Sequence, residues 1–155
     1  MPATRLSTVF ISALLSGLSG PAASAPEPTV TARRLSTAPV IYGKLDDAVW
    51  QEAAIIEEFL QDDPVAGDPP SEKTVVYLGY DADMIYLGLR AFDREPDKIV
   101  ARILQEDVNL AADDSFYVAI DSLVDRRNAY KFVINPLGTK RDTRIENNTT
   151  DRGEW

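Results

Sequence analysis

The chain has no cysteine and no histidine among its 155 residues. Without cysteine it can form no disulfide and offers no thiol nucleophile or lipid-anchor site. Without histidine it lacks the base of Ser-His-Asp and Cys-His hydrolases, the usual zinc ligands and the ordinary haem ligands. Any chemistry must therefore use carboxylates, amides, aromatic rings and basic side chains.

Basic residues are also in short supply. Lysine and arginine total 16 against 25 aspartates and glutamates, which gives a net charge of −9. Nucleic acids and anionic membranes bind concentrated positive charge. We therefore expect no nucleic-acid partner for this chain.

The first 25 residues have the composition of a secretory leader. Arg5 is followed by a short apolar run over residues 6–18 and by the small residues "GPAASA". The apolar run is too short to span a bilayer as a helix. We expect cleavage between Ala22 and Ala25 and export to the periplasm, the outer membrane or the extracellular space.

Short strand patterns dominate the rest of the chain. Residues 26–38 are polar and proline-rich and predict a flexible arm, after which Val40 and Ile41 are expected to start the first strand. "LDDAVWQEA" predicts one helical turn capped by Asp46. Further strands are expected in "AAIIEEFLQ", "KTVVYLGY", "MIYLGLRAF", "SFYVAID", "AYKFVIN" and "TKRDTRIE". With no long amphipathic helix, this series predicts an all-β fold, an antiparallel, jelly-roll-like β-sandwich with short helical turns.

Alternation along these strands separates two faces. One face is aliphatic and aromatic and is the expected core: Val76, Leu78, Tyr80, Ile85, Leu87, Leu89, Phe116, Val118, Ile120, Tyr130, Phe132 and Ile134. The other face mixes three tyrosines, two glycines and two cations with an alanine and a valine: Tyr77, Gly79, Tyr86, Gly88, Arg90, Tyr117, Ala119, Lys131 and Val133. This composition suits stacking against a sugar or docking of another domain, although strands also favour tyrosine without any function.

Four motifs in order carry a family resemblance: "GKLDDAVW", "VVYLGYDADMIYLGLRAFD", "DDSFYVAID" and "YKFVINPLG". They resemble carbohydrate-binding module family 9. They resemble one version of this module more closely than the family in general. That version lies at the N-terminus of bacterial exported proteins whose C-terminal region is a predicted outer-membrane β-barrel of unknown function. The similarity covers residues 39–155.

The chain departs from that family at two places. Characterised sugar binders of the family hold a glycan ring between two aromatic residues. Ala111 and Ala112 stand where the first of these is expected, and the second lies in a part of the module beyond "RGEW". Residues 39–155 are therefore expected to be a partial module, incomplete at the C-terminus, with an exposed sheet edge.

Trp50 raises the question of a sugar platform. It sits in the expected helical turn, with Leu45, Val49 and Ala53 nearby at helical spacing. A tryptophan on the apolar side of a turn is usually a core residue, and the resembling family uses this position structurally. We expect Trp50 to be buried.

Three acidic pairs could supply the acid and base of a glycoside hydrolase: Asp62 with Asp63, Asp81 with Asp83, and Asp113 with Asp114. Adjacent residues on a strand point to opposite faces, and aspartate is also a common turn residue. Catalysis is therefore not expected, and no catalytic residue or cofactor is assigned. A structural Ca²⁺, which related modules often carry, stays open without assigned ligands.

The sequence thus predicts a non-catalytic carbohydrate-binding module of an exported protein that binds or breaks down polysaccharide. The expected contacts to an oligosaccharide or polysaccharide are Tyr77, Tyr86, Arg90, Tyr117 and Lys131. Two alternatives stay open. The chain could be a docking domain that packs on a C-terminal barrel, or the full-length protein could be a glycoside-processing enzyme.

Overall fold

The computed structural model describes residues 29–148 and 150–153, with side chains as far as residue 148. The expected leader, residues 1–25, lies outside this range. None of the helical segments in the described residues has the length and hydrophobicity of a transmembrane span. The described residues form two compact units. One comprises residues 29–60 and Pro69–Arg94, and the other comprises Gln61–Asp68 together with residues 95–148 and 150–153.

Strands make up nearly all of the regular structure. They are β1 (Arg33–Arg34), β2 (Ala54–Ile56), β3 (Thr74–Tyr80), β4 (Ile85–Ala91), β5 (Phe116–Ile120), β6 (Ala129–Ile134), β7 (Lys140–Glu146) and β8 (Thr150–Gly153). The helical segments are two short 3₁₀ turns, η1 (Ala48–Glu52) and η2 (Pro96–Lys98). The predicted fold class is confirmed: the chain is all-β, with two sheets and short helical turns, as in sandwich-like folds.

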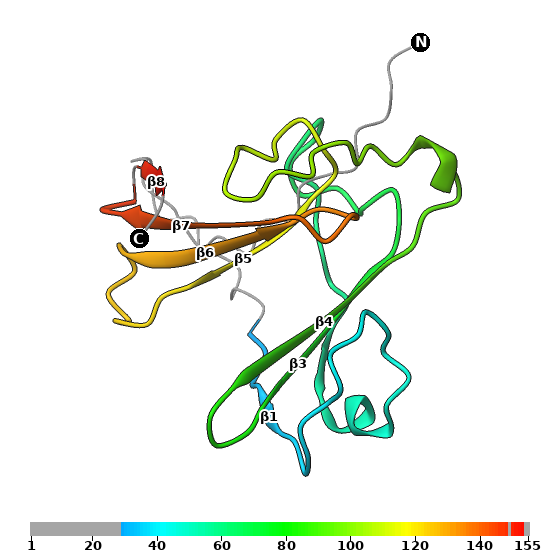
Figure 1. Cartoon of the computed structure of the whole chain (residues 1–155), viewed down its shortest axis with the longest axis vertical. Helices are drawn as coiled ribbons and strands as arrows, with labels where there is room; N and C mark the ends of the chain where they lie inside the picture. Colours follow the sequence, from blue (N-terminus) through cyan, green and yellow to red (C-terminus); the bar gives the residue numbers. More distant parts are fainter. Residues whose placement is uncertain (1–28, 149, 154–155) are drawn as a thin grey trace. The chain divides into compact units, whose positions relative to one another are not determined.

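The β1–β4 unit contains a four-stranded sheet built around β3. Strand β4 pairs with one side of β3 in antiparallel register, and β2 and β1 share its other side. The β3–β4 hairpin, drawn in green in Figure 1, aligns Thr74 with Ala91 and Tyr80 with Ile85. The turn between the two strands contains "DAD".

The β5–β8 unit contains a second four-stranded sheet, in the order β5-β6-β7-β8 and antiparallel throughout. Figure 1 shows β5, β6 and β7 side by side, from yellow to orange. Strands β6 and β7 form a hairpin that turns at "NPLG", and Gly138 adopts a φ of 83° in this turn, a conformation that favours glycine. Strand β8 was not predicted, because "NTTDRG" lacks an apolar alternation.

Trp50 is buried, as predicted. It belongs to η1, is 4% exposed, and forms a cluster with Leu35, Val49 and Ala53. The turn begins one residue later than expected: Asp47, not Asp46, is the capping residue, and its side chain makes no capping bond. The Asp47 carboxylate instead accepts a hydrogen bond from the Val40 amide at 2.7 Å.

The chain before η1 differs from expectation. Residues 26–38 were expected to be a flexible arm, but Arg33–Arg34 forms β1, and Leu35 is buried. Parallel pairing with the end of β3 and the Leu35 side chain hold this stretch on the sheet. Val40 and Ile41 form no strand and are exposed.

The two sheet faces also differ from expectation. Val76 lies on the expected core face and is fully buried, but five other members of that face are exposed: Tyr80, Ile85, Leu89, Phe132 and Ile134. Tyr80 and Ile85 flank the hairpin turn, and β4 is an edge strand, which explains part of this exposure. In each unit taken by itself, the buried cluster covers the face that was expected to point outward.

Candidate functional site

The five predicted sugar contacts belong to two different units. Tyr77, Tyr86 and Arg90 lie on the β1–β4 sheet, whereas Tyr117 and Lys131 lie on the β5–β8 sheet. They are therefore two groups of residues, and each group is considered within its own unit.

Tyr77 and Tyr86 do not stand on an open face. Both are half-buried and pack against the Trp50 cluster. The Tyr77 and Trp50 rings meet edge to face, with centroids 6.3 Å apart and an interplanar angle of 62°. This contact uses ring surface that a stacked sugar would need, so the expectation of an open tyrosine face is wrong here.

The glycines between these tyrosines explain how the cover fits. A Cβ on Gly79 would lie 2.7 Å from Leu35 Cγ, and a Cβ on Gly88 would lie 3.2 Å from Trp50 Cζ3. The sequence places both glycines on the face that was expected to bind a sugar or a partner domain. In the structure they make room for the cluster that buries that face.

The hydroxyl end of Tyr86 is held by the hairpin turn. It donates to Asp81 Oδ2 at 2.6 Å, while Asp81 Oδ1 accepts from the amides of Asp83 and Met84. The Tyr86 hydroxyl and then these two amides hold the pKa of Asp81 below its ordinary value. The same bond is the main cause of the raised pKa of Tyr86. Asp81 and Tyr86 thus form one fixed polar pair.

Arg90 is the candidate that solvent reaches most freely. It is exposed and lies on the same face of β4 as Tyr86, directly opposite Val75 of β3. Its guanidinium presents donors that suit hydroxyl or carboxylate oxygens. Of the five predicted contacts, Arg90 alone has an exposed side chain; the other four are buried or half-buried.

Tyr117 is buried, contrary to expectation. It is 7% exposed and packs with Leu110 and Val133 beneath Ile103 and Val108. Lys131 Nζ lies 4.6 Å from the centroid of its ring. Burial, and secondarily the charge of Asp62, raises the pKa of Tyr117 to about 12.

The cover over Tyr117 is fixed by a polar network that sequence reasoning missed. The buried Asp113 accepts hydrogen bonds at Oδ2 from the amides of Arg102 and Ile103, at 2.9 and 2.8 Å, and from Asn135 Nδ2 at 3.0 Å. Thr139 Oγ1 donates to the carbonyl of Ile103 at 2.8 Å. The loop before β5 is thereby tied to the turn between β6 and β7.

One feature of the sequence could have indicated this network. Asn135 and Thr139 bracket the turn "NPLGT", where an Asn side chain commonly bonds local amides, and Asn135 Oδ1 does accept from the amides of Leu137 and Thr139. Burial raises the pKa of Asp113, but the donated hydrogen bonds outweigh it and leave the pKa lowered. Asp113 is therefore a structural acceptor.

Other aspartates serve turns in the same way. Asp121 accepts from three amides of the β5–β6 loop, those of Leu123, Asp125 and Arg126. Asp125 accepts from Arg127 and Asn128. In the described part of the chain, no three acidic side chains gather where they could hold a metal ion. The structure assigns no ligands to the structural Ca²⁺ that stayed open, and that ion remains a prediction.

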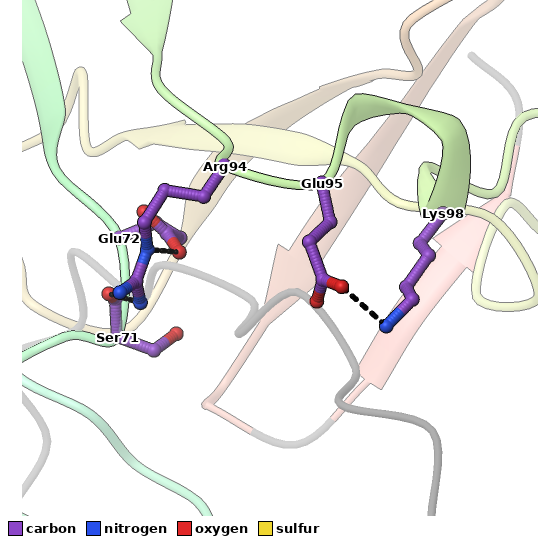
Figure 2. A network of polar contacts seen from close by, with 5 residues as sticks. All are labelled: Ser71, Glu72, Arg94, Glu95 and Lys98. Atoms are coloured by element: carbon purple, nitrogen blue, oxygen red, sulfur yellow. Dashed lines mark hydrogen bonds and ion pairs between the residues drawn. The ribbon is translucent and has the colours of Figure 1, made fainter.

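Exposed basic side chains that follow the β3–β4 hairpin in the sequence form local ion pairs. Arg94 Nε lies 2.7 Å from Glu72 Oε1 within the β1–β4 unit, and the Arg94 guanidinium also donates to the Ser71 carbonyl (Figure 2). In the β5–β8 unit, Lys98 Nζ lies 2.6 Å from Glu95 Oε1 (Figure 2). These cations neutralise neighbouring carboxylates.

The chain was compared with protein families, curated proteins and solved structures. No family model, no curated protein and no solved structure matches it. The resemblance to carbohydrate-binding module family 9 therefore rests on the four sequence motifs alone.

Proposed function

We propose that this chain is a non-catalytic carbohydrate-binding module of an exported protein that acts on polysaccharide. The observation that carries the non-catalytic part is the use of the carboxylates. Asp81, Asp113, Asp121 and Asp125 each accept at least two backbone amides, so they stabilise turns and loops. A general acid or base needs a carboxyl group directed at substrate.

The candidate contact region is the polar side of β4. Tyr86 supplies a half-buried ring, and its partner Asp81 supplies carboxylate oxygens in a fixed position. Arg90 lies four residues after Tyr86 on the same face of β4 and supplies exposed hydrogen-bond donors. Hydroxyl-rich ligands are held by a few such placed polar groups beside an apolar surface. The four motifs shared with the family support carbohydrate as the ligand class.

Tyr117 and Lys131 take a different role in this proposal. Because the Tyr117 ring is buried with an ammonium group over it, it supports the β5–β8 fold and not the ligand contact. A site with few open contacts predicts weak binding, on the order of millimolar dissociation constants.

Calorimetric titration of the purified protein with a panel of oligosaccharides tests this function. We expect a small heat with at least one sugar and its loss in Arg90→Ala. Lys98→Ala, which removes an exposed cation that pairs with Glu95 in the other unit, is the matched control and should keep the heat. Flat traces with every sugar at millimolar concentration, or equal heats in Arg90→Ala and the parent, would reject the proposal.

A second candidate function is docking to another domain of a longer protein. The exposed aliphatic side chains of Ile85 and Leu89 favour it, since protein partners cover such surface better than sugars do. Hydrogen exchange separates the two functions. Protection of β4 amides on addition of a downstream domain, together with flat sugar titrations, would favour docking.

A further inference from the structure

Strand β4 is a sheet edge without the usual protection. Within residues 29–148 and 150–153 it pairs with β3 alone. Natural edge strands are commonly shortened, bulged, or given proline or lysine to prevent pairing with another chain. The seven residues of β4, "IYLGLRA", contain neither proline nor lysine, and Arg90 is their single charge.

The other sheet edges whose side chains the structure describes are less available. On the far side of β3, β1 has two residues and β2 has three, which is too short for an extended ladder. Strand β5 is one edge of the second sheet, but none of its five residues is exposed. In β4, by contrast, four of seven residues are exposed, with Ile85 at 57% and Leu89 at 37%.

The sequence of β4 is complementary to itself when reversed. An antiparallel pair of β4 strands with its two-fold axis at Gly88 sets Leu87 against Leu89 and Ile85 against Ala91 on one face. On the other face it sets Tyr86 against Arg90, so that each guanidinium approaches a ring whose hydroxyl is bonded to the Asp81 carboxylate. Apolar side chains meet apolar ones, and positive charge meets an acidic pair.

We propose that β4 pairs with β4 of a second copy of this chain, in antiparallel register about Gly88, to give one continuous sheet across a two-fold dimer. Such an interface is isologous, because the same strand serves both sides. Main-chain hydrogen bonds supply the attraction, and the alternate side chains set the register. The inference needs no carbohydrate and goes beyond the proposed function.

Light scattering during size exclusion tests the dimer across a dilution series without any sugar. We expect twice the mass of a single chain at high concentration and a single-chain mass on dilution. Leu89→Lys should give a single chain at every concentration, because lysine on an edge prevents pairing. Leu104→Lys, at an exposed leucine of the other unit, is the control and should still dimerise.

Cysteine cross-linking tests the register independently. The parent chain has no cysteine. Ile85→Cys and Ala91→Cys proteins should form an interchain disulfide only when mixed, because opposed residues across the pair come within disulfide range. A single-chain mass throughout, a dimer that survives Leu89→Lys, or equal cross-linking by Ile85→Cys alone would overturn the proposal. If Leu89→Lys fails to fold, the cross-linking result decides.

Discussion

The β1–β4 unit and the β5–β8 unit each cover one face of a four-stranded sheet, but with different materials. In the β1–β4 unit the cover is apolar: the Trp50 indole, Leu35 and neighbouring residues of η1 fill the space above Gly79 and Gly88. In the β5–β8 unit the cover is an irregular loop, and Asp113 fixes it through backbone amides and Asn135.

The difference shows two ways to stabilise a small β unit without disulfides. The Trp50 cluster acts as an apolar plug: it gains free energy from apolar surface removed from water, and this gain depends on how well the side chains fit together. Asp113 and its donors act as a polar clamp: each hydrogen bond adds little net free energy, but together the bonds fix the loop in one place. Removing one partner is costly, because the remaining buried polar groups are left without hydrogen bonds. The first should be sensitive to volume, and the second to charge and pH.

Loss of the plug should have the largest effect. Trp50→Ala removes a fully packed indole and should lower the free energy of unfolding by ~3–5 kcal/mol. Denaturant titration monitored by circular dichroism measures this loss. Phe92→Ala, at a half-exposed ring of the same unit, is the control and should cost far less.

Hydrogen exchange in Trp50→Ala sharpens the comparison between the units. If each unit has its own cover, β3 and β4 amides lose protection while β5, β6 and β7 amides keep it. Equal loss in all five strands would show that the two units unfold as one.

Loss of the clamp should come second. Asp113→Ala leaves the amides of Arg102 and Ile103 without their acceptor and removes one of the two acceptors of Asn135 Nδ2, which keeps its bond to the Ile103 carbonyl. We expect a smaller destabilisation than in Trp50→Ala, with exchange protection lost first at Arg102 and Ile103. Asp97→Ala, at an exposed aspartate of η2, should leave both amides protected.

The clamp should also respond to acid. The pKa of Asp113 is lowered from its ordinary 3.8, so its contribution to stability is complete above that value and is lost as pH falls through the lower folded-state value. Protection of the Ile103 amide should therefore fall in this acid window. Asp113→Asn should remove that step, and an unchanged acid transition in this variant would contradict the assignment.

Shape should matter next, through a single methyl group. Gly79→Ala places a Cβ 2.7 Å from Leu35 Cγ, so the whole Leu35 side chain has to move, at a cost of ~1–3 kcal/mol. The same substitution in a Leu35→Ala background should cost much less, because the obstacle is gone. Equal costs in both backgrounds would mean that the steric contact is not the cause.

Much of the fold follows from the local sequence pattern. Most of the misassigned positions lie on sheet faces that a segment distant in the sequence covers. Alternation located β3 to β7 within about two residues, and helical spacing around Trp50 predicted its burial. Alternation says which residues share a face, but not which face another segment covers. Leu35 lies far along the chain from Gly79, and Asp113 is brought to Asn135 only by the loop. The assignment of Tyr77, Tyr86 and Tyr117 to an open face failed for that reason.

The smallest effect should come from the polar pair at the hairpin turn. Tyr86→Phe keeps the ring against the Trp50 cluster and removes only the hydroxyl that Asp81 accepts. Because that hydroxyl is the largest cause of the lowered pKa of Asp81, the pKa should rise toward its ordinary value in the variant, while the unfolding transition hardly moves. Carboxyl NMR titration measures the change, and Asp125, whose pKa is lowered by Asn128 in the other unit, is the internal control. An unchanged Asp81 titration would mean that the Asp83 and Met84 amides alone hold the carboxylate. The Asp81 carboxylate oxygens proposed for ligand contact would then be positioned by the turn amides and not by the Tyr86 hydroxyl.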